Sequence, residues 1–181
     1  EQSIKIPKVL HEVHGERSNW RDIFLAHSLA LVSTVFIVIS SLDDMQTWQS
    51  IFLGILTYDL VGGVVANFSL STSSNYAANP SKRRGFILLH LLQPTLLVLV
   101  FQADWIIVLS MSAYILISSI IVNSLQSHSQ QVITGAFLSI TGIFLLQIPI
   151  IEITPILQFL FTVFLLKLPL AWAVRWYDLN S

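Results

Sequence analysis

Six long apolar stretches, joined by short polar connections, constrain the fold of this chain more than any other feature. A helix needs about 20 mostly apolar residues to cross the hydrocarbon core of a bilayer. The stretches cover residues 23–42, 48–70, 86–102, 105–122, 132–148 and 153–176. They do not alternate polar with apolar residues, as the strands of a transmembrane barrel would. The sequence therefore predicts an all-α fold, a polytopic membrane protein with six transmembrane helices.

The composition leads to the same class of protein. Hydrophobic residues make up 54% of the 181 residues and charged residues only 10%, whereas a soluble domain has about 25% charged residues. In water such a chain would expose large apolar patches, so the lipid bilayer is its expected partner. The net charge of −1 argues against nucleic acid as a partner. The absence of cysteine excludes disulfides and thiolate chemistry.

Polar segments divide the chain into three parts. Residues 1–22 form a polar cytoplasmic N-terminal segment of mixed charge, without the apolar core of a signal peptide. Residues 23–176 form the six-helix transmembrane domain, in which the longest connection is a polar, turn-rich cytoplasmic loop at about residues 71–85. Residues 177–181 are a short C-terminal tail.

Basic residues predict the orientation of the chain, because lysine and arginine collect in cytoplasmic loops. With six spans, most of them fall on one side: Lys5, Lys8, Arg17, Arg21, Lys82, Arg83, Arg84 and Arg175. The other side carries acidic residues: Asp43, Asp44, Asp104 and Glu152. We therefore expect both termini in the cytoplasm, and a multi-pass protein of the plasma membrane.

One carboxylate lies in the middle of the second apolar stretch, in the sequence LTYDLVGGVVANFSL at residues 56–70. At about 100° per residue, one face of a helix here carries Asp59, Gly62, Gly63, Ala66 and Asn67. Small residues let a neighbouring helix approach closely, and an ionisable residue inside the membrane is a functional candidate by default. We expect this face to point into the bundle, with the two glycines and the alanine serving mainly for packing.

Four other polar residues lie within the expected spans near the cytoplasmic side: His27, His90, Gln93 and Lys167. Gln93 precedes Pro94, which removes a backbone donor and kinks a helix; carbonyls freed in this way often line a cavity. Together with Asp59 and Asn67, these residues predict a polar cavity that opens to the cytoplasm and ends near the bilayer centre. Alternatively, Lys167 extends its ammonium group to the membrane surface, and the two histidines are interior residues that bind no ligand.

His11 and His14 form an HxxH pair directly before the first expected span. On a helix their side chains lie on one face, where two imidazoles can bind a metal ion. A solvated amphipathic stretch explains the pair better, and no HExxH motif supports a metal site. The cofactor is therefore left open, with a metal ion as the candidate.

Three functions account for these residues. The favoured one is transport of an ion, a proton or a small solute, with Asp59 and its polar neighbours as the binding site. The first alternative is a membrane-embedded enzyme with metal-assisted or acid–base chemistry on a lipid. Its site would gather these residues: His11, His14, His27, Tyr76, Arg83 and His90. The second alternative is a non-catalytic subunit or assembly factor, in which Asp59 and Lys167 pair within the chain or with a partner subunit. Whether the chain forms a homo-oligomer is left open.

Overall fold

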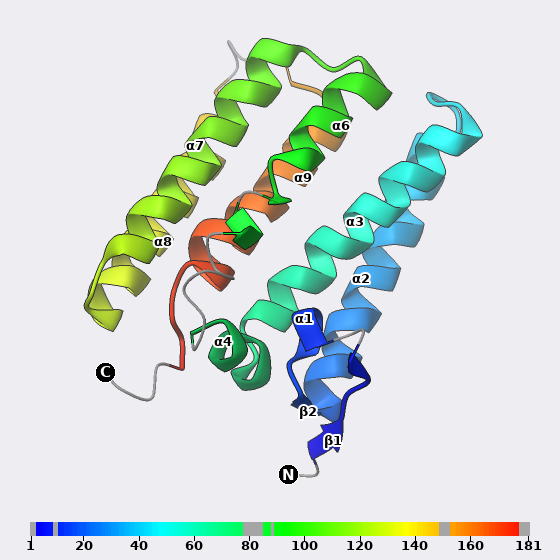
Figure 1. Cartoon of the computed structure of the whole chain (residues 1–181). Helices are drawn as coiled ribbons and strands as arrows, with labels where there is room; N and C mark the ends of the chain where they lie inside the picture. The colour runs from blue at the N-terminus through cyan, green and yellow to red at the C-terminus, as the bar shows by residue number, and fades with distance from the viewer. Residues whose placement is uncertain (1–2, 9–10, 78–84, 88, 149–152, 178–181) are drawn as a thin grey trace.

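The computed structural model describes residues 3–8, 11–77, 85–87, 89–148 and 153–177 (Figure 1). The elements follow in the order β1 (Ser3–Lys5), α1 (His11–His14), β2 (Arg17–Asn19), α2 (Trp20–Ser41), α3 (Thr47–Asn67), α4 (Leu70–Ala77), α6 (Leu92–Phe101), α7 (Trp105–Ser124), α8 (His128–Leu145), α9 (Pro155–Leu165) and η2 (Leu166–Trp172). Helix α4 occupies the first part of the expected loop at about residues 71–85. Several residues noted above lie outside the described residues: Lys82, Arg83, Arg84, Glu152 and the side chain of Tyr76.

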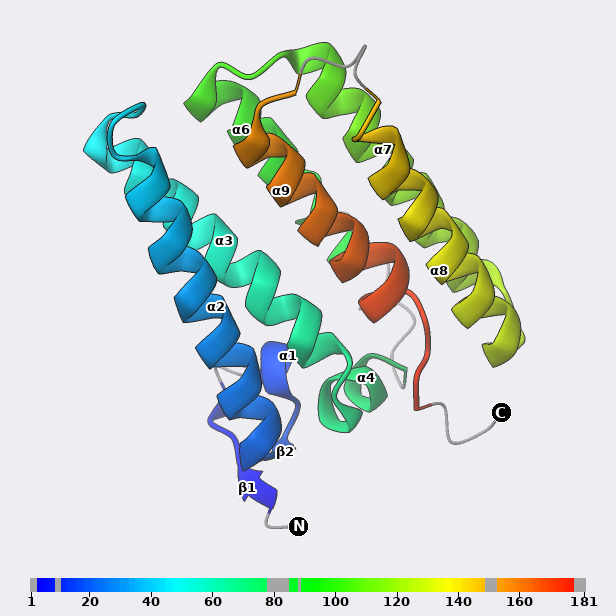
Figure 2. The ribbon, with the colours of Figure 1, turned by 180° about the vertical axis from the view of Figure 1, so that it is seen from behind.

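The long helices pack side by side in a bundle (Figures 1 and 2). Helices α2 and α3 form an antiparallel hairpin on one side, α7 and α8 form a second hairpin on the other side, and α6 and α9 lie between them. The two short strands, α1 and α4 gather at one end of the bundle, where the chain also leaves η2. The turns that follow α2 and α6 lie at the opposite end.

Within the part of the chain that the structure describes, four helical segments are long and apolar enough to cross a membrane: α2, α3, α7 and Pro155–Trp172, which joins α9 to η2. The third expected span is a shorter apolar helix, Gly85–Phe101, of which α6 is part. The fifth is α8, which begins with the polar sequence HSQQ and is less apolar for that reason. The helical class is therefore confirmed, and four of the six expected spans have the length and apolarity of a membrane helix.

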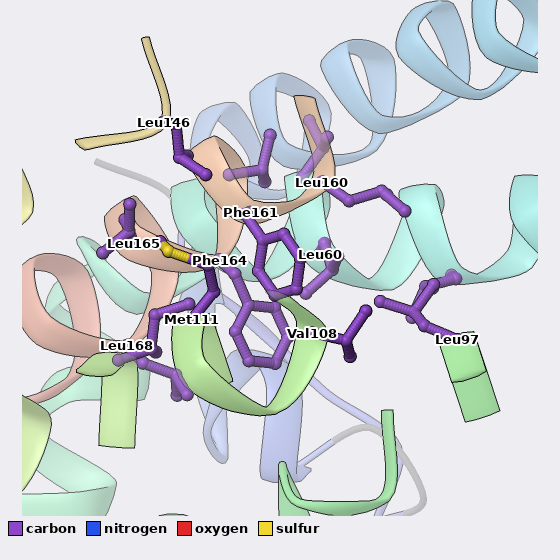
Figure 3. Close-up of a cluster of buried hydrophobic side chains, with 14 of the residues drawn as sticks. Leu60, Leu97, Val108, Met111, Leu146, Leu160, Phe161, Phe164, Leu165 and Leu168 are labelled. Carbon is purple, nitrogen blue, oxygen red and sulfur yellow. The ribbon is translucent and has the colours of Figure 1, made fainter. Parts of the chain in front are cut away.

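A core of apolar side chains lies between α3, α7 and α9 (Figure 3). Leu60 of α3, Val108 of α7 and Phe161 of α9 are almost completely buried in it. Helix α2 stands at the edge of this bundle and packs mainly on α3. Its outer face stays apolar and exposed, with Phe36 at 68% and Ile39 at 65% exposure. Such a face suits contact with lipid acyl chains, which are as apolar as leucine.

The N-terminal segment departs from an all-helical fold. Strands β1 and β2 pair antiparallel, with Ser3 opposite Asn19, and they flank α1 in the sequence. Helix α2 begins at Trp20, within the segment expected to precede the membrane. It begins there because the side chain of Asn19 caps it, accepting a hydrogen bond from the backbone N–H of Arg21 at 3.1 Å.

Helix α4 fixes this N-terminal segment to the bundle. The hydroxyl of Thr72 donates to the backbone oxygen of Val13 at 2.7 Å, and the hydroxyl of Ser71 donates to that of Ser18 at 3.2 Å. Gly15 has a φ of 69°, in the left-handed region that glycine adopts readily. A Cβ atom there would lie 2.6 Å from the backbone oxygen of Ser71. The close approach that positions α1 therefore requires glycine.

Candidate functional site

Asp59 of α3 and Lys167 of η2 form an ion pair between these two elements. Nζ of Lys167 lies 2.7 Å from Oδ2 of Asp59, and it also donates to the backbone oxygen of Asp59 at 3.2 Å. Nε2 of Gln93 donates to the same carboxylate oxygen at 2.7 Å. The side chain of Lys167 is 4% exposed, whereas that of Asp59 is 54% exposed. The cation is therefore enclosed by protein, and the carboxylate faces open space.

Gly63 provides the space that the ammonium group occupies. A Cβ atom at this position would lie 2.5 Å from Cε and 2.9 Å from Nζ of Lys167, well inside the separation at which non-bonded carbon atoms pack. The adjacent Gly62 faces α2 instead, where a Cβ atom would meet the Cβ of Ala30 at 3.4 Å. The glycines expected to serve packing thus have different roles, and only Gly63 makes room for the ion pair.

Lys167 lies in a wide helical turn next to a proline. Pro169 has no backbone N–H, so the backbone oxygen of Leu165 lacks its usual helical donor. The hydroxyl of Ser139 on α8 also donates to this oxygen at 3.0 Å and so joins α8 to this turn. The chain follows a π-helical path over Leu166–Trp172, a geometry that is frequent at functional sites.

A cavity of about 290 Å³ adjoins the ion pair. Its polar lining comes from α1, α2, α3 and η2 and consists of His14, His27, Tyr58, Asp59, Asn67 and Lys167. Asn67 is 5% exposed, and its side-chain nitrogen has no hydrogen-bond partner among the described residues. A buried donor without a partner costs about 1–3 kcal/mol. A bound molecule with an acceptor group would therefore be stabilised beside Asn67.

A chain of hydrogen bonds from α1 to α3 lines the same cavity. The Nε2 atoms of His14 and His27 are 3.0 Å apart, and Nδ1 of His27 lies 2.6 Å from the hydroxyl oxygen of Tyr58. His14 is 3% exposed. Burial lowers the pKa of His14, and the neighbouring His27 lowers it further. The His14 ring is therefore held in its neutral form more firmly than a histidine in water.

His90 does not line this cavity. Its Nδ1 lies 2.7 Å from the backbone oxygen of Phe86, and its ring packs against Phe86 and Phe164 at centroid distances of 4.3 and 5.8 Å. It remains close enough to Asp59 and Lys167 to interact with them electrostatically. These contacts are those of a satisfied interior histidine, the alternative that the sequence had left open.

The HxxH pair does not converge on one point. His14 turns to His27, whereas Nε2 of His11 lies 2.8 Å from the backbone oxygen of Ile6. Within the part of the chain that the structure describes, no group of three or more His, Asp or Glu side chains is placed to hold a metal ion. In this arrangement the side chains of His11 and His14 do not face a common point at which both could bind one metal ion.

Most of the expected site residues do come together: Asp59, Asn67, Lys167 and His27 line the cavity, and Gln93 reaches it through Asp59. The side chain of Lys167 is buried against Asp59 and does not reach the surface of the protein. Sequence reasoning missed Tyr58 and considered His14 only as a metal ligand. A phenol directly beside an intramembrane acid was the available signal for Tyr58.

Comparisons of the chain with protein-family models, with curated proteins and with solved structures find no match. We therefore infer function from the chemistry of the site. An ion pair that borders a cavity can exchange its partners, because a proton or a cation competes with Lys167 for the carboxylate of Asp59.

Proposed function

We propose that this protein is a small multi-pass transporter of the plasma membrane, which moves an ion, a proton or a small solute through a cavity open to the cytoplasm. The observation that carries the proposal is the ion pair of Asp59 and Lys167 at the wall of a cavity of about 290 Å³. A charged side chain at the bilayer centre costs at least about 2.5 kcal/mol, and such residues mark ion and proton pathways. If these two residues served only to pack the helices, apolar side chains of similar volume would stabilise the fold equally well.

Asp59 is the proposed coupling residue. Its ionised carboxylate neutralises the enclosed ammonium group of Lys167. When Asp59 takes up a proton or binds a cation, Lys167 loses its counter-charge and the pair separates. Breaking a buried ion pair costs about 3–5 kcal/mol, so the two states of Asp59 favour different packing of η2 against α3. A change of this size is enough to shift a population between two conformations.

We further propose six membrane spans with both termini in the cytoplasm, in which α6 and α8 belong to the two additional spans. The charge distribution supports this orientation. Lys5 and Arg17 belong to the strands at one end of the bundle, whereas Asp43 and Asp104 lie in the turns after α2 and α6 at the other end. Because the chain has no cysteine, single introduced cysteines report sidedness without background. Maleimide added to intact cells should label Asp43→Cys but not Ser127→Cys, and the reverse pattern contradicts the orientation.

Proton flux into proteoliposomes tests the transport function. Asp59→Asn keeps the shape of the side chain and removes its charge, so we expect flux to be lost at matched folding. Asp104→Asn is the matched control, because Asp104 caps α7 by accepting from Ile106 and Ile107 at 2.8 and 3.2 Å, and asparagine caps a helix equally well. Native protein that moves neither protons nor any of several cations, across a range of pH, would contradict the transport of protons or other cations.

A further inference from the structure

We propose that His14, His27 and Tyr58 form a proton relay that leads from the end of the bundle near α4 to the cavity beside Asp59. This inference rests on the transport function proposed above, and it identifies the coupled ion as a proton. The observation behind this inference is the chain of hydrogen bonds between the three side chains. Neither the ion pair nor the packing of the helices depends on these hydrogen bonds.

The three side chains are joined without a gap. The contacts of 3.0 Å between the two Nε2 atoms and 2.6 Å between Nδ1 of His27 and the Tyr58 hydroxyl are hydrogen-bond distances. A neutral imidazole accepts at one ring nitrogen and donates at the other, and a phenol hydroxyl does both. Each member can therefore receive a proton on one side and release one on the other.

The chain of hydrogen bonds runs along the bundle, from its α4 end toward the middle of α3. His14 ends α1, outside the membrane helices, whereas His27 and Tyr58 lie within α2 and α3. With a rise of 1.5 Å per residue, Tyr58 lies roughly 13 Å from the α4 end of α3, a substantial part of the roughly 30 Å hydrocarbon core. Tyr58 and Asp59 both line the cavity of about 290 Å³, which greatly exceeds the roughly 15 Å³ that one water needs. Water in the cavity can therefore complete the path.

Each transfer in this relay is balanced. His14 gives its Nε2 proton to Nε2 of His27, His27 gives its Nδ1 proton to the oxygen of Tyr58, and Tyr58 gives its hydroxyl proton toward Asp59. His14 takes up one proton at Nδ1 from the side of the N-terminal segment. Every step breaks one N–H or O–H bond and forms one, so one proton moves inward and all three groups end neutral. Reversal of both tautomers and rotation of the hydroxyl reset the chain.

The surroundings of the relay favour its neutral form. In the described part of the chain, the other ionisable groups at the cavity wall are Asp59 of α3 and Lys167 of η2, which neutralise each other. Burial and the neighbouring His27 lower the pKa of His14, so protonated His14 is disfavoured and passes its charge on. A fixed imidazolium at this position would block the chain.

Proton flux in proteoliposomes of the full chain tests the relay. Tyr58→Phe keeps the ring and removes the hydroxyl, and His27→Gln keeps a polar side chain that cannot carry a proton. We expect each to lower flux on the order of tenfold or more, since a positioned proton-transfer group contributes about 10²–10⁴-fold. Tyr114→Phe is the matched control and should leave flux unchanged, because the Tyr114 hydroxyl donates to the backbone of Leu138 within the α7–α8 hairpin.

The outcomes separate the relay from the transport function. If Tyr58→Phe and His27→Gln keep native flux while Asp59→Asn abolishes it, the relay is wrong and transport stands. If native protein moves a solute but no protons, the relay is also wrong. NMR of the histidine ring nitrogens gives a test that does not depend on flux. A hydrogen bond detected between Nε2 of His14 and Nε2 of His27, with a ring signal of His27 that changes in Tyr58→Phe, supports the relay, and the absence of this hydrogen bond overturns it.

Discussion

Replacement of Gly63 by alanine is the perturbation that most directly affects the ion pair. The new Cβ would lie 2.5 Å from Cε and 2.9 Å from Nζ of Lys167. Moving the ammonium group away from Asp59 breaks a buried pair, at about 3–5 kcal/mol. Spreading α3 from η2 instead costs about 1–3 kcal/mol, as in other overpacked interiors. The cheaper route dominates, so we expect a penalty of about 1–3 kcal/mol.

Gly62→Ala is the control that isolates this penalty. Both variants gain about the same helix propensity, close to 1 kcal/mol over glycine. At Gly62 the new methyl group makes only an ordinary contact with Ala30 at 3.4 Å. The unfolding free energy in mixed detergent micelles should therefore be lower for Gly63→Ala than for Gly62→Ala by about 1–3 kcal/mol. Equal stability of the two variants would refute the placement of Lys167 against Gly63.

Asp59→Asn should destabilise the protein more than Lys167→Met, by a margin measurable in the same unfolding assay. Asp59→Asn leaves the enclosed ammonium group of Lys167 without its counter-charge, which costs about 3–5 kcal/mol of stability. Lys167→Met instead leaves the carboxylate of Asp59, which faces open space. Ser139→Ala should cost about 0.5–1.5 kcal/mol because it removes a buried hydrogen bond to the backbone oxygen of Leu165; Ser124→Ala, at an exposed hydroxyl bonded to its own helix, should change stability by less than about 0.5 kcal/mol. The pKa of His14 is lowered from 6.5, so the docking of α1 is stable above that pH and weakens as the pH falls through the lowered pKa. Hydrogen exchange of the N-terminal segment measures this loss, and His14→Gln should abolish the pH dependence.

The membrane helices could be predicted because length and apolarity are enough to define a span. Helices α2 (Trp20–Ser41) and α3 (Thr47–Asn67) lie close to the expected residues 23–42 and 48–70. The shorter third helix and the polar start of α8 explain why a count of apolar stretches reached six, while four helices among the described residues meet the requirements of a span. The strands β1 and β2 span three residues each, too few for an alternating pattern to reveal them.

Individual site residues could be predicted, whereas the pairing of Asp59 with Lys167 within the chain was only one of the alternatives that the sequence left open. Asp59 and Lys167 each drew attention because a charge inside the membrane is costly. They are 108 residues apart, and their contact depends on the order in which the helices pack. The place of His14 depends on the turn at Gly15 and on its contact with α4. Long-range packing of this kind leaves no local pattern in the sequence.

Proton flux through the double variant Asp59→Asn, Lys167→Met tests the central claim most directly. This variant removes both charges together, so it avoids the uncompensated ammonium group that destabilises Asp59→Asn alone. If the ion pair is the coupling element, the double variant folds like the native protein in proteoliposomes and carries no protons. Native flux through the folded double variant would show that protons cross without the ion pair, and it would contradict the account.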